Sequence, residues 1–412
     1  MQIDKTLALA TATEIAEHLC RVSFSHGGRC SWCGTVDMGH EDSESLIYRT
    51  LGPDLYEGTS GIALFLGETF LRVGERRFRE AAGGGISRAL DRLEEVPREC
   101  RFGFYSGAVG VLYAAARLGE ILDRSDLIVR ARDTLTDVTG DFDHPFLIDI
   151  VSGAAGAIPI LLALADTLEM PELLLRAHRL GEAIVAAASK DAQGWSWEPE
   201  VTGIGSARNL TGFAHGAAGI GWSLLELFRR TAEVQFLDGA LEAFRYENRW
   251  FQPEEDNWPD FRWDDGTEGP APCMVAWCHG AAGIGLARLS ALRVREDAWL
   301  RRDLEAAVRA SKRVLAEPDG QPDGDFSLCH GQSGIAAFLL HAGAVLEDIA
   351  ARDLAITVAA GRAARFAATP GGWPVGVRRG STPSLMTGLA GIGYFYLGLA
   401  DPELQSILLF QP

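Results

Sequence analysis

The chain has 412 residues, of which 47% are hydrophobic and 23% charged, and 56 Asp and Glu outnumber 38 Lys and Arg to give a formal net charge of -18. This composition is that of a folded globular protein and excludes wholesale disorder. Because proteins that bind a phosphate backbone need clustered Lys and Arg, the charge argues against nucleic acid and an anionic membrane surface as partners. At about 150 residues per domain, the length alone suggests two or three domains.

The start of the chain has no features of a signal peptide. Asp4 stands where such a peptide has basic residues, and no short apolar core with a cleavage site follows. No run reaches the roughly 18 apolar residues of a membrane span, so we predict no membrane insertion. The seven cysteines are an odd number in a chain without a secretion signal. This favours reduced thiols and a cytoplasmic location.

The glycines recur in a pattern that indicates an internal repeat. Seven times the chain shows Gly-x-x-Gly followed by an apolar stretch, with successive copies 46 to 64 residues apart. A fixed motif at such spacings is typical of repeat architectures. The glycine pairs are Gly58/Gly61, Gly107/Gly110, Gly153/Gly156, Gly216/Gly219, Gly280/Gly283, Gly331/Gly334 and Gly388/Gly391.

Each repeat is predicted to be a pair of helices. The stretches after the glycines, such as 62–66 and 335–340, are rich in Ala and Leu and apolar nearly all round, as expected of buried helices. The segments between them, such as 304–315, have apolar residues at helical spacing and a charged face. We expect the glycines to allow positive φ and close approach of neighbouring backbones. Strand signals are almost absent.

Seven such hairpins could form an open superhelix or a closed ring. An open array needs polar end repeats, whereas the first and last repeats here both keep strongly apolar inner helices. We therefore predict an all-α fold, an α/α toroid with a double ring of inner and outer helices. Residues 51–412 would form this seven-hairpin ring, and residues 1–50 an N-terminal helix and a loop leading into it.

Aligning the repeats on their first glycine places chemically active residues in two columns. Cys278 and Cys329 lie two residues before that glycine in the fifth and sixth repeats. The residues immediately before it are Glu57, Ser106, Ser152, His215, His279, His330 and Thr387. In a closed ring both columns face one end of the central cavity.

Cys278, Cys329 and His330 are candidate zinc ligands. Two thiolates and one imidazole from adjacent repeats suit tetrahedral zinc and leave its fourth position open, as in catalytic sites. The alternatives are buried cysteines with a structural histidine, or a closed Cys2His2 site that includes His279.

His215 and Asp149 are candidate catalytic groups near this site. A histidine next to an open zinc position is suited to general acid or base chemistry near neutral pH. Asp149 is a lone acid in the apolar run 146–151, where a carboxylate needs a cationic or catalytic partner. The alternatives are a histidine bonded to a backbone carbonyl and a carboxylate that caps a helix.

Several motifs resemble those of the lanthionine synthetase C-like cyclases. These are 277–285 (WCHGAAGIG), 328–331 (LCHG), 212–216 (GFAHG) and Asp149-x-x-x-Gly153. The segments 55–65, 257–262 and 385–393 are most similar to the C-terminal cyclase domain of class II lanthipeptide synthetases. The likeness spans about residues 45–412.

The resemblance implies an α/α toroid that holds one Zn2+ per chain on Cys278, Cys329 and His330. It implies a lanthipeptide cyclase that adds cysteine thiolates of a dehydrated ribosomal precursor peptide to dehydroalanine or dehydrobutyrine, forming lanthionine or methyllanthionine thioethers. Class II enzymes also carry an N-terminal dehydratase region for which 412 residues leave no room, so we expect a separate dehydratase partner or an excised domain.

The resemblance also assigns acid–base candidates. His215 and Asp149 match family motifs, and His279 is a third candidate catalytic residue. His279 stands where stand-alone class I cyclases usually have Tyr, and Met274 where they tend to have Arg, so roles copied from class I do not transfer to these two positions.

Two other functions compete with the cyclase. One is a non-catalytic toroid that binds or scaffolds a modified precursor peptide and its partner enzymes. The other is a toroidal carbohydrate enzyme, which would need a pair of cavity carboxylates, whereas Asp149 alone stands out.

Overall fold

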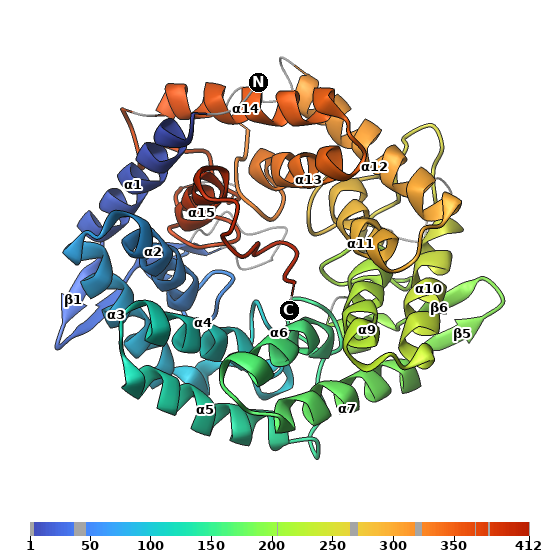
Figure 1. Ribbon diagram of the computed structural model, residues 1–412, viewed down its shortest axis with the longest axis horizontal. Coiled ribbons are helices and arrows are strands. Elements are labelled where there is room, and N and C mark those ends of the chain that lie inside the picture. Colours follow the sequence, from blue (N-terminus) through green and yellow to red (C-terminus); the bar gives the residue numbers. More distant parts are fainter. Residues whose placement is uncertain are drawn as a thin grey trace.

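A computed structural model describes residues 4–36, 47–203, 205–263, 271–317, 324–366, 368–377 and 380–411. These residues form two concentric rings of helices (Figure 1). The predicted all-α toroid is confirmed. None of the described helices combines the length and the apolar character that crossing a bilayer requires.

The inner ring consists of seven apolar helices, and each begins immediately after the first glycine of a repeat. That glycine is the N-cap in every case. Neighbouring inner helices pack on one another all the way round, including the last on the first, so the ring is closed. The inner helices are α2 (Thr59–Val73), α4 (Ala108–Ile121), α6 (Ala154–Thr167), α9 (Ala217–Thr231), α11 (Ala281–Val294), α13 (Gln332–Val345) and α15 (Leu389–Ala400).

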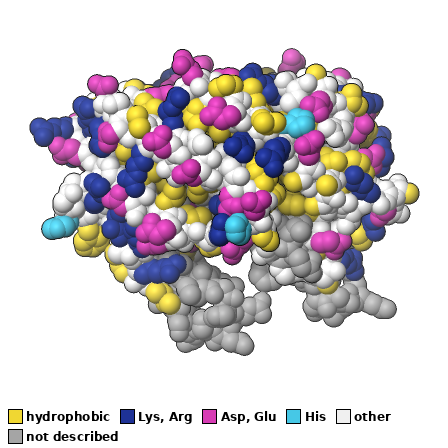
Figure 2. Space-filling view, turned by 90° about the horizontal axis from the view of Figure 1, so that it is seen from below, with side chains coloured by type: hydrophobic (Ala, Val, Ile, Leu, Met, Phe, Trp, Pro, Cys, Tyr) yellow, Lys and Arg dark blue, Asp and Glu magenta, His cyan; other side chains and the backbone are white. Residues whose placement is uncertain are grey.

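The outer ring consists of amphipathic helices, each packed mainly against one inner helix. On the side shown in Figure 2, acidic and basic side chains are interspersed over the outer surface, with apolar ones between them. This mixture is what a solvated helical face requires. The outer helices are α3 (Arg76–Asp91), α5 (Ser125–Gly140), α7 (Glu172–Ala186), α10 (Val234–Asn248), α12 (Ala298–Ala316), α14 (Ile349–Phe366) and α1 (Lys5–Arg21).

Ring closure depends on the first helix of the chain. The outer partner of α15 is α1, which buries Ala8, Ala12, Ile15 and Leu19. The helix expected within residues 1–50 therefore completes the seventh pair. The boundary at residue 50 stays a prediction.

The second glycine of each pair is required by close packing. A Cβ there would collide with the carbonyl oxygen of the residue three before the first glycine, for example that of Phe104 at Gly110 or Leu385 at Gly391. The expectation of positive φ at the first glycine is wrong for six of the seven helix starts, which are extended. Only Gly280, before α11, has a positive φ, at 78°. Close approach, and not left-handed backbone, is the main reason for the repeated glycines.

The loops before the inner helices are joined into a closed belt of backbone hydrogen bonds. In each repeat an N–H donates to the carbonyl of the next repeat, two residues before its first glycine. Because buried backbone groups must be paired, this belt holds every loop in one register around the ring axis. The acceptors, in order, are the carbonyls of Tyr105, Val151, Ala214, Cys278, Cys329, Met386 and Tyr56.

Short strands occur in the connecting loops, which the sequence did not indicate. Within the described residues they form three two-stranded antiparallel sheets, β1–β2, β3–β4 and β5–β6. These hairpins lie outside the helical core and do not alter the all-α class. The strands are β1 (Phe24–His26), β2 (Arg29–Ser31), β3 (Cys33–Val36), β4 (Ile47–Thr50), β5 (Ser189–Asp191) and β6 (Gly194–Ser196).

The segment after α15 turns into the centre of the ring (Figure 1). Its residues Ile407 to Phe410 are all buried. The Tyr105 hydroxyl donates to the carbonyl of Ile407 over 2.6 Å, and the Trp277 indole N–H donates to the carbonyl of Leu408 over 2.9 Å. Apolar tail residues thus fill the middle of the toroid next to the belt.

Candidate metal centre

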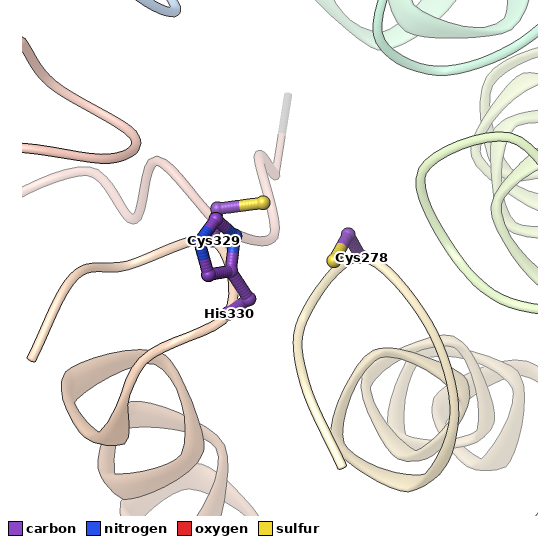
Figure 3. A group of neighbouring side chains, drawn as sticks. All are labelled: Cys278, Cys329 and His330. Atoms are coloured by element: carbon purple, nitrogen blue, oxygen red, sulfur yellow. The ribbon is translucent and has the colours of Figure 1, made fainter. Parts of the chain in front are cut away.

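Cys278, Cys329 and His330 are brought together by two adjacent loops of the belt. Cys278 precedes α11 and the other two residues precede α13, and the two sulfurs face each other across the gap between the loops (Figure 3). Their ligand atoms all lie within 4.8 Å of one another. Both cysteines are buried, whereas the His330 side chain is 31% exposed. The donor set of two sulfurs and one nitrogen fits zinc and keeps one side accessible.

The imidazole of His330 is oriented by groups behind it. Its Nε2 lies 3.0 Å from the carbonyl oxygen of Gly376 and 3.4 Å from a carboxylate oxygen of Asp325. Ser327 in turn donates to Asp325 through both its backbone N–H and its hydroxyl. A histidine that binds a metal commonly donates its other N–H to such a carbonyl or carboxylate. This arrangement therefore leaves Nδ1 as the nitrogen for a metal.

The electrostatics of Cys278, Cys329 and His330 favour the binding of a cation. The hydrogen bond with Cys329, followed by burial, raises the pKa of the Cys278 thiol well above its ordinary value. Burial alone lowers the pKa of His330, but its hydrogen bond to Cys278 and the charges of Asp325 and Cys278 raise it to about 9. Two adjacent sulfurs cannot both hold negative charge without a positive partner, and a bound metal ion supplies one.

Asp149 and His215, the two candidate catalytic groups of the sequence, form a pair beside this group. A carboxylate oxygen of Asp149 bonds Nδ1 of His215, and its other oxygen accepts the backbone N–H of Ser152 over 2.8 Å. Asp149 has no exposed surface, and the His215 side chain is 16% exposed. One oxygen of the carboxylate thus ties the loop ahead of α6 and the other holds His215. The pairing leaves Nε2 as the ring nitrogen of His215 that is not bonded to Asp149, and the catalytic interpretation of both residues stays a prediction.

His279 lies behind His215 and not within the metal-ligand group. The two rings stack with centroids 5.9 Å apart. His279 is completely buried, with Nδ1 3.6 Å from a carboxylate oxygen of Asp260. Burial and then the charge of Arg262 lower its pKa well below the ordinary value, so the ring is neutral. The described geometry does not favour the closed Cys2His2 alternative.

Asp260 and Arg262 belong to the site but were given no role by sequence reasoning. Arg262 donates to both carboxylate oxygens of Asp260, the shortest contact being 2.7 Å, and its Nη2 lies 3.7 Å from the Met274 sulfur. Burial alone lowers the pKa of Arg262, yet the bonds to Asp260 and the charges of Cys278 and Cys329 raise it overall. A fixed guanidinium thus lies close enough to interact with both ligand thiols. The only sequence signal was their place in the 257–262 motif.

Two helical layers closed into a ring, with a Cys2His group at one end of the axis, define an α/α toroid with a candidate metal centre. A model of the family described as lanthionine synthetase C-like protein matches residues 49–410. The chain belongs to this family.

Relatives of known name agree with this membership. The chain is 22% identical over 343 residues to the lacticin 481/lactococcin biosynthesis protein LcnDR2 of Lactococcus lactis subsp. lactis, a match that covers 81% of this chain and 34% of that protein. The chain thus spans about a third of the length of this curated relative.

Two solved structures share the fold at low identity. Nisin cyclase superposes with a TM-score of 0.65 and 17% identity, covering 86% of this chain and 90% of its own. The GH76A α-1,6-mannanase of Salegentibacter sp. HEL1_6 gives a TM-score of 0.50 and 12% identity, covering 97% and 100%. Because enzymes of different names share this toroid, the fold alone does not determine the reaction, which depends on the side chains of the site.

Proposed function

We propose that this protein is a zinc-dependent lanthipeptide cyclase. The observation that carries the proposal is the Cys278, Cys329 and His330 group, whose ligand atoms lie within 4.8 Å in a chain of the lanthionine synthetase C-like family. The substrate would be a dehydrated ribosomal precursor peptide, with a dehydratase acting before this enzyme. Bound zinc would supply the positive charge that lowers the pKa of a peptide thiol and holds it as a thiolate.

In the reaction, the peptide thiolate attacks Cβ of a dehydroalanine or dehydrobutyrine residue. The S–Cβ bond forms, the alkene electron pair moves toward the carbonyl oxygen as an enolate, and a proton is then added at Cα. His215 donates that proton from Nε2, because Asp149 holds its Nδ1. The peptide thiol loses its proton to solvent, Cα gains one from His215, and His215 takes up a proton from solvent, so the product is an isomer of the substrate.

The surrounding charges favour the enolate. Arg262, held by Asp260, supplies a fixed positive charge on the side of the two cysteines, and the N-termini of the inner helices point toward the same belt. His279 supports this arrangement as a neutral ring between His215 and Asp260. Its complete burial favours a positioning role over contact with the peptide.

Incubation with a dehydrated precursor peptide and zinc tests the proposal. We expect free peptide cysteines to disappear while the peptide mass stays constant, since the addition is an isomerisation. Alkylation with a thiol reagent before and after the reaction, read by mass spectrometry, counts the cysteines consumed. Binding of the peptide with all its cysteines still reactive would favour the non-catalytic toroid instead.

His215→Asn should slow cyclisation by about 100-fold or more, because a positioned general acid contributes on the order of 10²- to 10⁴-fold. Zinc content should remain that of the wild type, since His215 is not among the ligands. Cyclisation rate and bound zinc are measured on the same sample. His178→Asn, which alters a histidine of the outer helix α7 paired with Glu233, is the matched control and should leave both values unchanged. A wild-type rate in His215→Asn would remove His215 from the mechanism.

A further inference from the structure

Tyr56 occupies the same register in the first repeat as the two ligand cysteines in theirs. It lies two residues before Gly58, and its backbone is part of the belt: its N–H donates to the Tyr105 carbonyl over 2.8 Å, and its carbonyl accepts from Met386 over 2.9 Å. Its hydroxyl donates to the sulfur of Cys329 over 2.7 Å, across 273 positions of sequence. The belt therefore positions a hydrogen-bond donor on one of the candidate metal ligands.

A tyrosine hydroxyl keeps its proton near neutral pH, because its ordinary pKa is about 10, so the Tyr56 hydroxyl is available as a donor. The ring is supported by an edge-to-face contact with Tyr105, whose centroid is 6.4 Å away. Tyr56 is accordingly a neutral and well-held donor that the proposed acid–base chemistry does not use.

A cyclase of this kind must protect its own thiolates. Dehydroalanine is an electrophile toward any thiolate, and Cys329 belongs to the group at which the proposed addition would take place. If Cys329 attacked, its sulfur would bond to Cβ and a proton would add at Cα, which joins the peptide covalently to the enzyme and removes a metal ligand. A hydrogen bond to the sulfur lone pair stabilises the thiolate charge and lowers its reactivity toward carbon.

We propose that Tyr56 is a positioning residue that fixes Cys329 as a ligand and makes its sulfur a poor nucleophile. Addition is thereby directed to the peptide thiol. This inference rests on the proposed function. Hydrogen bonds to metal ligands from groups behind them typically change metal affinity by about 10- to 100-fold. The first repeat thus contributes to a site whose ligands come from the fifth and sixth.

The test compares Tyr56→Phe with Tyr105→Phe. Each substitution removes one hydroxyl, and the two tyrosines occupy equivalent positions in neighbouring repeats. The Tyr105 hydroxyl, however, donates to the Ile407 carbonyl and not to a sulfur. Each protein is titrated with Co2+, and the sulfur-to-cobalt charge-transfer band is recorded. The zinc-loaded proteins are then treated with iodoacetamide, in which the sulfur bonds to the acetamide carbon and iodide leaves, and alkylation of Cys329 is followed by peptide mass spectrometry.

For Tyr56→Phe we expect a charge-transfer band shifted to longer wavelength, metal affinity about 10-fold weaker, and Cys329 alkylation several-fold faster than in the wild type. Tyr105→Phe should match the wild type in all three. An unchanged band and alkylation rate in Tyr56→Phe would overturn this inference. A wild-type protein that shows no charge-transfer band would instead contradict the proposed zinc site, so the two failures are distinguishable.

Discussion

Cys329→Ala is expected to reduce bound zinc from about one per chain to a small fraction and to slow cyclisation by at least about 100-fold. The variant leaves two protein ligands where zinc sites keep three or four, and metal-assisted charge stabilisation contributes several kcal/mol to such reactions. Since about 1.4 kcal/mol corresponds to a factor of ten in rate, a loss of this size follows. Metal analysis and the thiol-blocking assay, applied to the same preparation, measure the two effects.

The control for this experiment is Cys20→Ala. Cys20 lies on α1 in the outer ring and belongs to no metal-ligand group among the described residues. The Cys20→Ala variant should keep the zinc content and cyclisation rate of the wild type. The circular dichroism spectra of both variants should match that of the wild type. Full cyclisation by Cys329→Ala, or by wild-type protein stripped of metal, would contradict the zinc-dependent mechanism.

Arg288→Leu is expected to destabilise the fold by about 3–5 kcal/mol, because it leaves buried carboxylates without their counter-charge. Arg288 has no exposed surface and pairs with Glu247 over 3.1 Å and with Asp303 over 2.9 Å. Glu247 in turn accepts the backbone N–H groups of Gly212 and Ala218, which flank His215. The pair therefore links α10 and α11 to the loop that carries the proposed acid. Urea unfolding at pH 7 measures the loss.

The pH dependence of this effect has a definite sign. Burial raises the pKa of Glu247 to about 7 in spite of Arg288, while an unfolded glutamate has its ordinary lower value. The contribution of Glu247 to stability is thus fully present below the unfolded pKa and is lost as pH rises through about 7. Without Arg288 the pKa rises further, so acidification from pH 8 to pH 6 should recover part of the lost stability.

The matched control is Arg124→Leu. Arg124 and Asp126 form an exposed pair with side chains 41% and 63% exposed. Exposed pairs contribute at most about 1 kcal/mol, so this loss should be small and nearly independent of pH. Equal losses in the two variants would show that the Arg288 cluster does not hold the ring together.

Repetition made much of this architecture predictable. Each inner helix begins directly after the first glycine of a repeat. The second glycine is required because a Cβ there would collide with the loop carbonyl three residues before the pair. That contact places the two preceding residues at a constant register in every repeat. Cys278 and Cys329 could therefore be placed side by side from sequence alone, since adjacent repeats bring equivalent positions together.

The contacts that act across the ring were not predictable in this way. The bond from Tyr56 to Cys329 joins the first and sixth repeats, and Arg262 reaches the site from a loop outside the repeat pattern. Neither contact leaves a periodic pattern in the sequence, because each joins segments that meet only when the ring closes. The positive φ expected at the helix starts was also wrong for six of seven, since extended backbone satisfies the same close packing.

The repeat, the helix starts and the register of the candidate ligands can be predicted from the amino-acid sequence, because they follow from local periodicity and from glycines that no larger residue can replace. Three other features are evident only in the folded chain: α1 packs on α15, Asp149 bonds His215, and His279 is completely buried. These features depend on distances between segments far apart in the chain and on the exclusion of water. These distances are set, and water is excluded, only once the belt of backbone hydrogen bonds has closed.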